Sequence, residues 1–302
     1  MRYVVGYSAN ARGRDAVNLA ISLARGRGAS LDLGLVVPEV QQPGAHAPTA
    51  GFENLLNEQA RQWLDEALAL VPADVPARGH IRAGDSDAQA LIEAAEELGA
   101  DVLVIGATSA GLFKRFTVGS VASALLHAST VPVALAPHGY HRQEALNRIS
   151  CGLGSRAGAE KLLDFALGMA ANRQIPLRVV SLLALDGGDS APAEAAREYA
   201  EKTVAAAAPL SPSGTLLAAT TEVAVAQGRS IEEAVDGLGW DDGEVLVIGS
   251  SRLAQGRSIF LGSTANRILR ALPVPMLVVP SGYELKHQNQ STANDTSREA
   301  QL

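Results

Sequence analysis

The segment Asp101-Val-Leu-Val-Ile-Gly106 recurs 143 positions later as Glu244-Val-Leu-Val-Ile-Gly249, and this repeat decides the fold. In both copies a Gly-Ser pair follows thirteen residues after the glycine, as Gly119-Ser120 and as Gly262-Ser263. Near the start of the chain the shift is 146 positions, which pairs Val5-Gly6 with Cys151-Gly152. Because a fixed internal period marks a duplicated structural unit, the sequence predicts one domain written twice.

Short apolar runs alternate with helical periodicity in both copies, which is typical of α/β folds with a parallel sheet. The run Val102–Ile105 is apolar on both faces, as a central parallel strand covered by helices requires. We therefore expect two tandem, doubly wound, Rossmann-like sheets of five parallel strands with helices on both faces. The expected strands lie near residues 2–8, 30–37, 76–82, 101–106, 132–136, 147–152, 176–185, 215–225, 244–249 and 275–280. The expected helices lie near residues 12–27, 51–71, 86–98, 118–129, 156–173, 192–208, 229–238 and 262–271.

Composition excludes several classes of protein. The chain has 302 residues, 47% of them hydrophobic, which is enough for about two domains with their own cores. A net charge of −7 does not favour a broad basic surface, so we expect neither nucleic acid nor a membrane as a partner. The single cysteine, Cys151, cannot form an internal disulfide, which fits the cytoplasm. The uncharged stretch Val118–Pro137 is interrupted by Pro132, which favours a buried helix-turn-strand unit over a membrane span.

The end of each repeated strand carries residue types that suit an anion. A glycine at the end of a strand allows the backbone to approach a ligand, and Gly119-Ser120 at the start of a helix directs N–H groups toward a phosphate. The alternative is that Gly-Ser forms only a turn and a helix N-cap, without any ligand. Lys114 and Arg115 in the first loop could contact a phosphate or stay solvated.

These residues, in this order and spacing, resemble the universal stress protein family. The family's nucleotide loop reads Gly, two residues, Gly, nine residues, and Gly-Ser or Gly-Thr, and the segments that begin at Gly106 and at Gly249 are similar to it. The likeness covers residues 2 to 281 and implies a tandem member with the adenine-nucleotide-binding fold of that family. It implies a cytoplasmic stress-response regulator that binds ATP or a related adenine nucleotide, with Mg²⁺ as part of the nucleotide complex. We expect domains at residues 1–140 and 146–282, followed by a polar, disordered tail at 283–302.

The resemblance implies one nucleotide site in each copy. In ATP-binding members an aspartate after the first strand, an apolar residue on the second strand and the glycine loop surround the nucleotide. Here Ser8 and Gly154 stand at the aspartate position, and Ser109 and Arg252 replace the second loop glycine, which argues against binding. The closing Gly-Ser pairs are intact in both copies. The candidate nucleotide-binding residues are Ser8, Val36, Ile105, Gly106, Ser109, Gly119, Ser120, Val121, Leu182, Ile248, Gly249, Arg252, Gly262, Ser263 and Thr264.

Two other functions remain open from the sequence. The first is an interaction protein without nucleotide, which works by pairing the apolar edge-strand candidates Val131–Pro137 and Val274–Pro280. Family members associate through that strand, so the resemblance implies pairing of the two domains within the chain, or a homodimer. The second is an NAD-dependent or nucleotide-hydrolysing enzyme. The Gly152–Ala157 turn reads G-x-G-x-x-A, but it lacks the acidic residue about 20 positions later, so we assign no catalytic or metal-binding residue.

Overall fold

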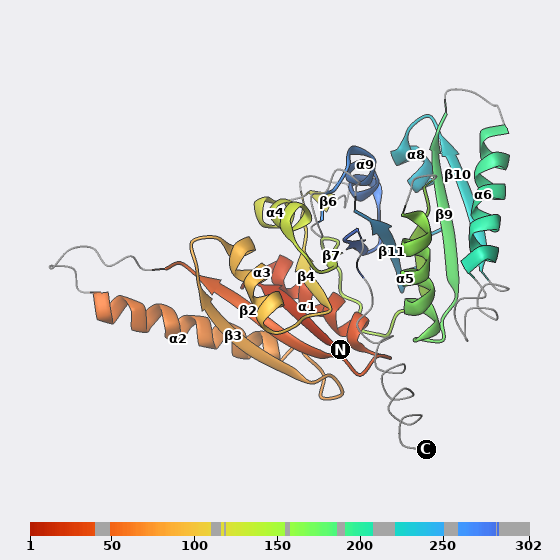
Figure 1. Ribbon diagram of the computed structural model, residues 1–302. Coiled ribbons are helices and arrows are strands. Elements are labelled where there is room, and N and C mark those ends of the chain that lie inside the picture. The colour runs from red at the N-terminus through yellow and green to blue at the C-terminus, as the bar shows by residue number, and fades with distance from the viewer. Residues whose placement is uncertain are drawn as a thin grey trace, which may run out of the picture.

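The computed structural model describes residues 1–39, 49–109, 116–117, 119–154, 158–185, 191–207, 221–250, 259–281 and 283. Two α/β halves lie side by side, each with a central group of parallel strands (Figure 1). The first half contains β1 (Arg2–Tyr7), β2 (Ser30–Val37), β3 (Ala77–Ala83), β4 (Val102–Gly106), β5 (Thr108–Ser109), β6 (Phe116–Thr117) and β7 (Val133–Ala136). The second half contains β8 (Arg148–Gly152), β9 (Leu177–Ala184), β10 (Glu222–Gly228), β11 (Glu244–Gly249) and β12 (Met276–Val279). The predicted α/β class is confirmed.

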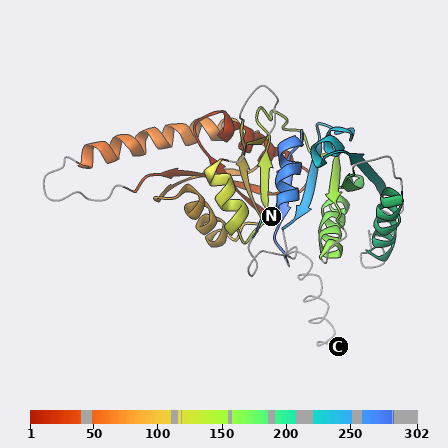
Figure 2. The same cartoon turned by 90° about the horizontal axis from the view of Figure 1, so that it is seen from above.

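Helices lie on both sides of the strands, as the view from above shows (Figure 2). Those of the first half are α1 (Ala11–Ala24), α2 (Thr49–Leu68), α3 (Asp87–Glu97) and α4 (Ser120–Ala128). Those of the second half are α5 (Ala159–Ala171), α6 (Ala191–Ala207), α8 (Ile231–Asp236) and α9 (Ser263–Ala271). One hydrophobic cluster packs α1, α2, α5 and α6 against one face of the strands, and a second packs α3, α4, α8 and α9 against the other. Both clusters contain residues from both halves, so the core is continuous across the molecule.

A single ten-stranded sheet runs through both halves in the order β10-β9-β8-β11-β12-β7-β4-β1-β2-β3. Each half contributes five parallel strands, and β7 pairs antiparallel with β12, placing Leu135 opposite Met276 and Val133 opposite Val278. The two expected five-stranded sheets are therefore present, but they are joined edge to edge rather than separate. Every residue of β7 and β12 is buried, so the junction covers two apolar strand edges that would otherwise be open to pairing.

One strand lies at a different place from the expected one. We expect the third strand of the second copy near 215–225, whereas β10 spans Glu222–Gly228, and residues 208–220 fall outside the described part of the chain. The residues before Glu222 are as apolar as the strand itself, so hydrophobic periodicity does not locate its start. Pairing with β9, which sets Glu222 opposite Arg178, fixes the observed register.

The segment between the halves and the end of the second half both pack against the first half. Tyr140 is buried, its hydroxyl donates to the Ser22 hydroxyl oxygen over 3.3 Å, and the N–H of Gly139 donates to Asp15 over 2.9 Å. Tyr283 donates a hydrogen bond to the carbonyl of Asp101 over 3.1 Å. Tyr283 therefore belongs to the folded part rather than to the predicted tail, of which residues 284–302 lie outside the described part.

Within the uncharged stretch Val118–Pro137, the described residues 119–137 contain a short helix and a strand, α4 and β7. Among the helices that the structure describes, none has the length and apolar character needed to cross a membrane.

Candidate functional site

The first candidate site lies at the carboxyl ends of β1 and β4. The sheet order places β2 on one side of β1 and β4 on the other, so the connections after β1 and β4 diverge to opposite sides of this point. Open α/β sheets bind ligands at such a reversal of strand order, outside the carboxyl ends of the strands. Ser8 follows β1 directly and Gly106 ends β4, so the structure brings these two candidate residues to the same edge.

Ser8 takes part in the start of α1. Asn10 is the N-cap of this helix, and its side-chain oxygen accepts hydrogen bonds from the N–H groups of Arg12 and Gly13 over 3.0 and 3.3 Å. The Ser8 hydroxyl donates to the same Asn10 oxygen over 3.2 Å. At the position where the family's ATP-binding members have an aspartate, this chain therefore has a hydroxyl engaged with a helix cap. Sequence analysis missed Asn10, although an asparagine just before a helix is a recognised capping signal.

Gly106 is required by packing. A Cβ at this position would lie 2.1 Å from the carbonyl oxygen of Arg12, because the first turn of α1 sits directly against the end of β4. The absence of a side chain at Gly106 is thus explained by close approach of helix and strand. The same contact brings Arg12, an exposed cation that sequence analysis did not single out, to the edge where the candidate residues gather.

The first glycine loop is closed at its base by a two-stranded ladder. Thr108 and Ser109 in β5 pair antiparallel with Thr117 and Phe116 in β6. Ser109, which replaces the second glycine of the family loop, therefore has strand conformation, and the one described non-glycine residue with positive φ is Gln174 at 55°. The described backbone at this position does not need glycine. Residues 110–115, including Lys114 and Arg115, lie outside the described part of the chain.

The N-terminus of α4 has no side-chain cap. Gly119 is the N-cap residue, with φ −69° and ψ 170°, and Ser120 is the first residue inside the helix. Gly119 thus forms the N-cap that the ligand-free alternative also expects, while the Ser120 side chain is not the capping group. By contrast, α3 and α8 are capped by the hydroxyls of Ser86 and Ser230. Since the first N–H groups of a helix have no partner within it, α4 presents donors and the positive end of its dipole at the loop.

Apolar side chains lie next to these donors on one face of the sheet. Ile105 is buried in the hydrophobic cluster beneath α3 and α4, and Val36 and Val121 are partly buried against that same cluster. A pair of apolar strand residues beside a helix N-terminus suits a ligand with one flat, apolar part and one anionic part.

The second candidate site is built differently. Gly249 is exposed, and a Cβ there would make ordinary contact with Leu162 at 3.6 Å. The second loop is closed at its base by Ser250, whose hydroxyl oxygen accepts from the Phe260 N–H over 2.8 Å. Gly262 is the N-cap of α9, again without a side-chain cap. Ser263 and Thr264 are exposed, Ile248 is buried, Leu182 is partly buried, and Arg252 lies outside the described part.

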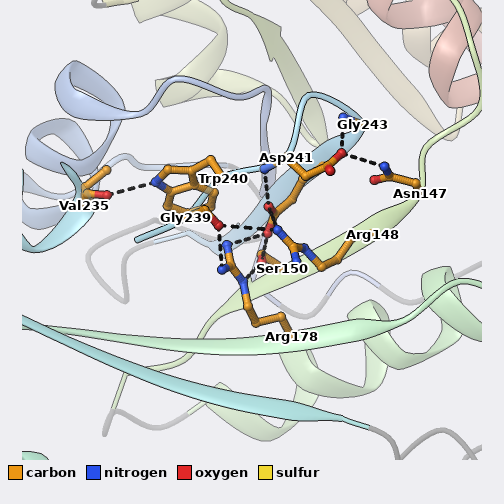
Figure 3. Close-up of polar contacts among 10 residues, drawn as sticks. Asn147, Arg148, Ser150, Arg178, Val235, Gly239, Trp240, Asp241 and Gly243 are labelled. Atoms are coloured by element: carbon orange, nitrogen blue, oxygen red, sulfur yellow. Dashed lines mark hydrogen bonds and ion pairs between the residues drawn. The ribbon is translucent and has the colours of Figure 1, made fainter. Parts of the chain in front are cut away.

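A polar cluster lies at the opposite edge of the sheet, at the amino ends of β8, β9 and β11 (Figure 3). The Glu244 side chain is 0% exposed and forms ion pairs with Arg148 and Arg178, with N–O distances of 2.6 and 2.7 Å. The Ser150 hydroxyl donates to the same carboxylate, and the guanidinium of Arg178 stacks 5.0 Å from the Trp240 ring centre. Because both guanidinium groups pair with the buried carboxylate and the cluster lies away from the ligand-binding edge, we assign it a structural role.

The repeat gives this cluster a counterpart in which one of the three charges, that of Asp32 against Arg178, is reversed. Arg2 lies between two carboxylates in the first half, with its Nε 2.9 Å from Asp32 and its backbone N–H 2.8 Å from Asp101. The shifts of 146 and 143 positions place Arg2, Asp32 and Asp101 on Arg148, Arg178 and Glu244. Both halves thus bury an ion cluster at the same edge, and only its charge pattern differs.

Cys151 does not have the surroundings of a reactive thiol. Its side chain is fully buried in β8, and burial raises the pKa of the thiol to about 12. Among the described residues, no group of three or more His, Cys, Asp and Glu side chains is placed to hold a metal ion.

We expect Cys151 to resist a thiol reagent such as dithionitrobenzoate in the native protein at mildly alkaline pH, because the thiolate is the reacting species. After unfolding in guanidinium chloride, one thiol per chain should react at once. Absorbance of the released aromatic thiolate measures both rates. Equal rates in the native and the unfolded protein would contradict the buried position of this residue.

Comparison with known proteins shows which family this arrangement is similar to. The profile of the universal stress protein family matches residues 1–137 and again residues 146–280. A universal stress protein of Mycobacterium tuberculosis is 32% identical over 299 residues, which cover 93% of this chain and all of that protein. Among solved structures, a universal stress protein from Archaeoglobus fulgidus superposes with a TM-score of 0.69 at 17% identity, covering 93% of this chain and 98% of the other. A putative universal stress protein from Pseudomonas aeruginosa gives 0.58 at 18% identity, covering 93% of each chain.

Proposed function

This chain belongs to the universal stress protein family as a tandem member, and from that premise we propose that it is a cytoplasmic stress-response regulator that binds ATP or a related adenine nucleotide in its first half. The observation that carries the proposal is the N-terminus of α4. Its N-cap, Gly119, supplies no side chain, and the helix opens beside the edge of the sheet where α/β folds bind ligands. The stress role rests on family membership.

In this proposal the residues have distinct tasks. The N–H groups that follow Gly119 and the hydroxyl of Ser120 donate to the phosphates, and Arg12 adds a cation. Val36, Ile105 and Val121 contact the base, while Ser8, Gly106 and Ser109 shape the edge of the site. Mg²⁺ would enter as part of the nucleotide complex. We propose domain bounds of 1–140 and 146–282 and assign no catalytic step to any residue.

We propose the second half as the weaker site. Its candidate residues are Leu182, Ile248, Gly249, Arg252, Gly262, Ser263 and Thr264. Gly154 supplies no side chain at the family's aspartate position, and the space next to Gly249 is occupied only by an aliphatic side chain. Neither feature replaces the missing carboxylate. As in the first half, however, the N-cap residue of the following helix is a glycine, Gly262.

The substitution Gly119→Val tests the first site. Gly119 has extended backbone angles that valine adopts readily, so the variant should fold, while its branched side chain fills the space in front of the helix. Wild-type protein should give a binding isotherm with ATP in calorimetry, and Gly119→Val should weaken the affinity by about tenfold or more. The control is Thr130→Val, an exposed position just beyond the other end of α4, which should bind as the wild type does.

The alternative, an interaction protein without nucleotide, predicts the opposite result. Wild-type protein would then carry no extractable nucleotide and give no heat at millimolar ATP. This alternative draws on the antiparallel pairing of β7 with β12, and we propose that this pairing holds the two halves together in solution. Since the pairing occupies the last strand of both halves, any homodimer would use another surface. Steady phosphate release that Gly119→Val abolishes would instead support an enzyme.

A further inference from the structure

The end of the second glycine loop lies on the first half of the molecule. The N–H of Ile259 donates to the carbonyl of Ser129 over 2.8 Å, and the N–H of Leu261 donates to the carbonyl of Leu126 over 3.1 Å. Between them, the Phe260 ring packs edge-on against the His127 ring at 5.1 Å between centres. We call the segment Ile259–Leu261 the clasp, because it holds the carboxyl end of α4.

The clasp satisfies groups that α4 cannot satisfy itself. The last carbonyls of a helix have no intrahelical partner, and Leu126 contributes one of them. Ile259 and Leu261 are both buried in the hydrophobic cluster that contains Leu125 and Leu126. The carboxyl end of α4 is therefore completed by the second half, by backbone hydrogen bonds and by packing together.

The opposite end of the same helix is the proposed nucleotide site. With nine residues and a rise of about 1.5 Å per residue, α4 is only about 13 Å long. Isolated helices this short have marginal stability in water, and their turns form cooperatively. Contacts that stabilise one end of α4 therefore also stabilise the other end. A ligand that orders the first turn of α4, after Gly119, thus also stabilises the helical conformation of the carboxyl end, on which the clasp docks.

A reciprocal contact runs the other way. Strand β6, at the base of the first glycine loop, contacts α9, the helix that opens at Gly262 in the second half. The described end of each loop therefore lies against the helix that follows the other loop, the clasp against α4 and β6 against α9. Ser250 ties Phe260 to the start of the second loop, so the clasp is a continuous part of that loop.

From these contacts we infer that the clasp and α4 form one regulatory unit: the clasp of the second half sets the affinity of the nucleotide site at the start of α4. The inference rests on the proposed nucleotide site and adds its regulation. Ordering of α4 by ligand and docking of the clasp favour each other, and this coupling is reciprocal by thermodynamic linkage.

Amide hydrogen exchange with and without ATP tests the coupling, at an ATP concentration that saturates the wild type but leaves Gly119→Val largely unbound. In wild-type protein ATP should slow exchange at Ile259 and Leu261 by about fivefold, and Gly119→Val should abolish this protection. Protection that persists in Gly119→Val would mean that ATP orders the second loop directly, and would overturn the inference.

The substitution Phe260→Ala tests the coupling from the other side. It should weaken ATP binding by about fivefold and, without any nucleotide, should speed exchange of the amides from Ser123 to Ser129. His127→Ala removes the other ring of the same contact at an exposed position and should have the same effects. It replaces Phe260→Ala in the test if that variant does not fold. Tyr283→Phe is the control, because it also removes a contact between the halves but does not touch α4, and it should behave as the wild type.

The outcomes separate the two proposals. A wild type that binds no ATP refutes the proposed function, and the coupling with it. A wild type that binds ATP without protecting Ile259 and Leu261, and whose affinity is unchanged in Phe260→Ala, refutes the coupling alone.

Discussion

Replacing Glu244 with alanine is expected to lower the free energy of unfolding by about 3–5 kcal/mol. The carboxylate is 0% exposed and holds two guanidinium groups, of which Arg178 is only 5% exposed. Alanine would leave Arg178 buried without its counter-charge and would remove the acceptor of the Ser150 hydroxyl. Urea unfolding followed by circular dichroism measures the change, which is a large part of the stability of a typical domain.

The matched control is Glu232→Ala in the same half of the molecule. Glu232 also pairs with an arginine, Arg267, at 2.9 Å, but the two side chains are 27% and 45% exposed. Since solvent screens exposed pairs and hydrates the remaining charge, this substitution should cost only a small fraction of the Glu244 loss. Similar losses for the two variants would show that burial does not set the strength of the Glu244 cluster.

Replacing Gly106 with alanine is expected to cost about 3 kcal/mol, although only one methyl group is added. The new Cβ would lie 2.1 Å from the Arg12 carbonyl oxygen and 2.8 Å from its carbon. Both are backbone atoms in the first turn of α1, so no side-chain rotation relieves the overlap and the helix must move. Thermal and urea unfolding of the variant measure the cost.

The repeat supplies the control at the equivalent position. Gly249→Ala adds the same methyl group at the end of β11, where the nearest atom is 3.6 Å away on the flexible side chain of Leu162. We expect a change within about 0.5 kcal/mol. Equal destabilisation of the two variants would mean that both glycines are needed for their backbone conformation, and would reject the packing explanation for Gly106.

The central strands and their burial could be predicted because a strand covered by helices on both sides needs apolar residues on both faces. The runs Val102–Ile105 and Val245–Ile248 are apolar on both faces, which only a strand covered on both sides requires, and both are central strands. The antiparallel junction of β7 with β12 could not be fixed in this way. Both strands are apolar, but their sequences do not specify which strand each one pairs with or in which direction. The pairing depends on how the two complete halves pack against each other.

The position of the candidate loop could be predicted from its glycines, whereas the packing that requires Gly106 could not. The spacing from Gly106 to Gly119 marks a loop between a strand and a helix, and the structure has both elements there. The spacing does not reveal that Arg12, nearly a hundred positions away, touches Gly106, because that contact follows from how closely α1 packs on the sheet. Asn10 was within reach of sequence reasoning, whereas Arg12 was not.

If the two halves pair through β7 and β12 in solution as proposed, the pairing should not depend on protein concentration. A pair of separate chains joined by the same pairing would come apart as their concentration fell. Here residues 138–147 connect the two halves, and a short linker keeps each half at an effective concentration on the order of millimolar for the other. The two halves are also synthesised in equal number, because they belong to one chain. A change in the amount of this protein in a cell would therefore change the number of paired halves, but each pair would still consist of one first half and one second half.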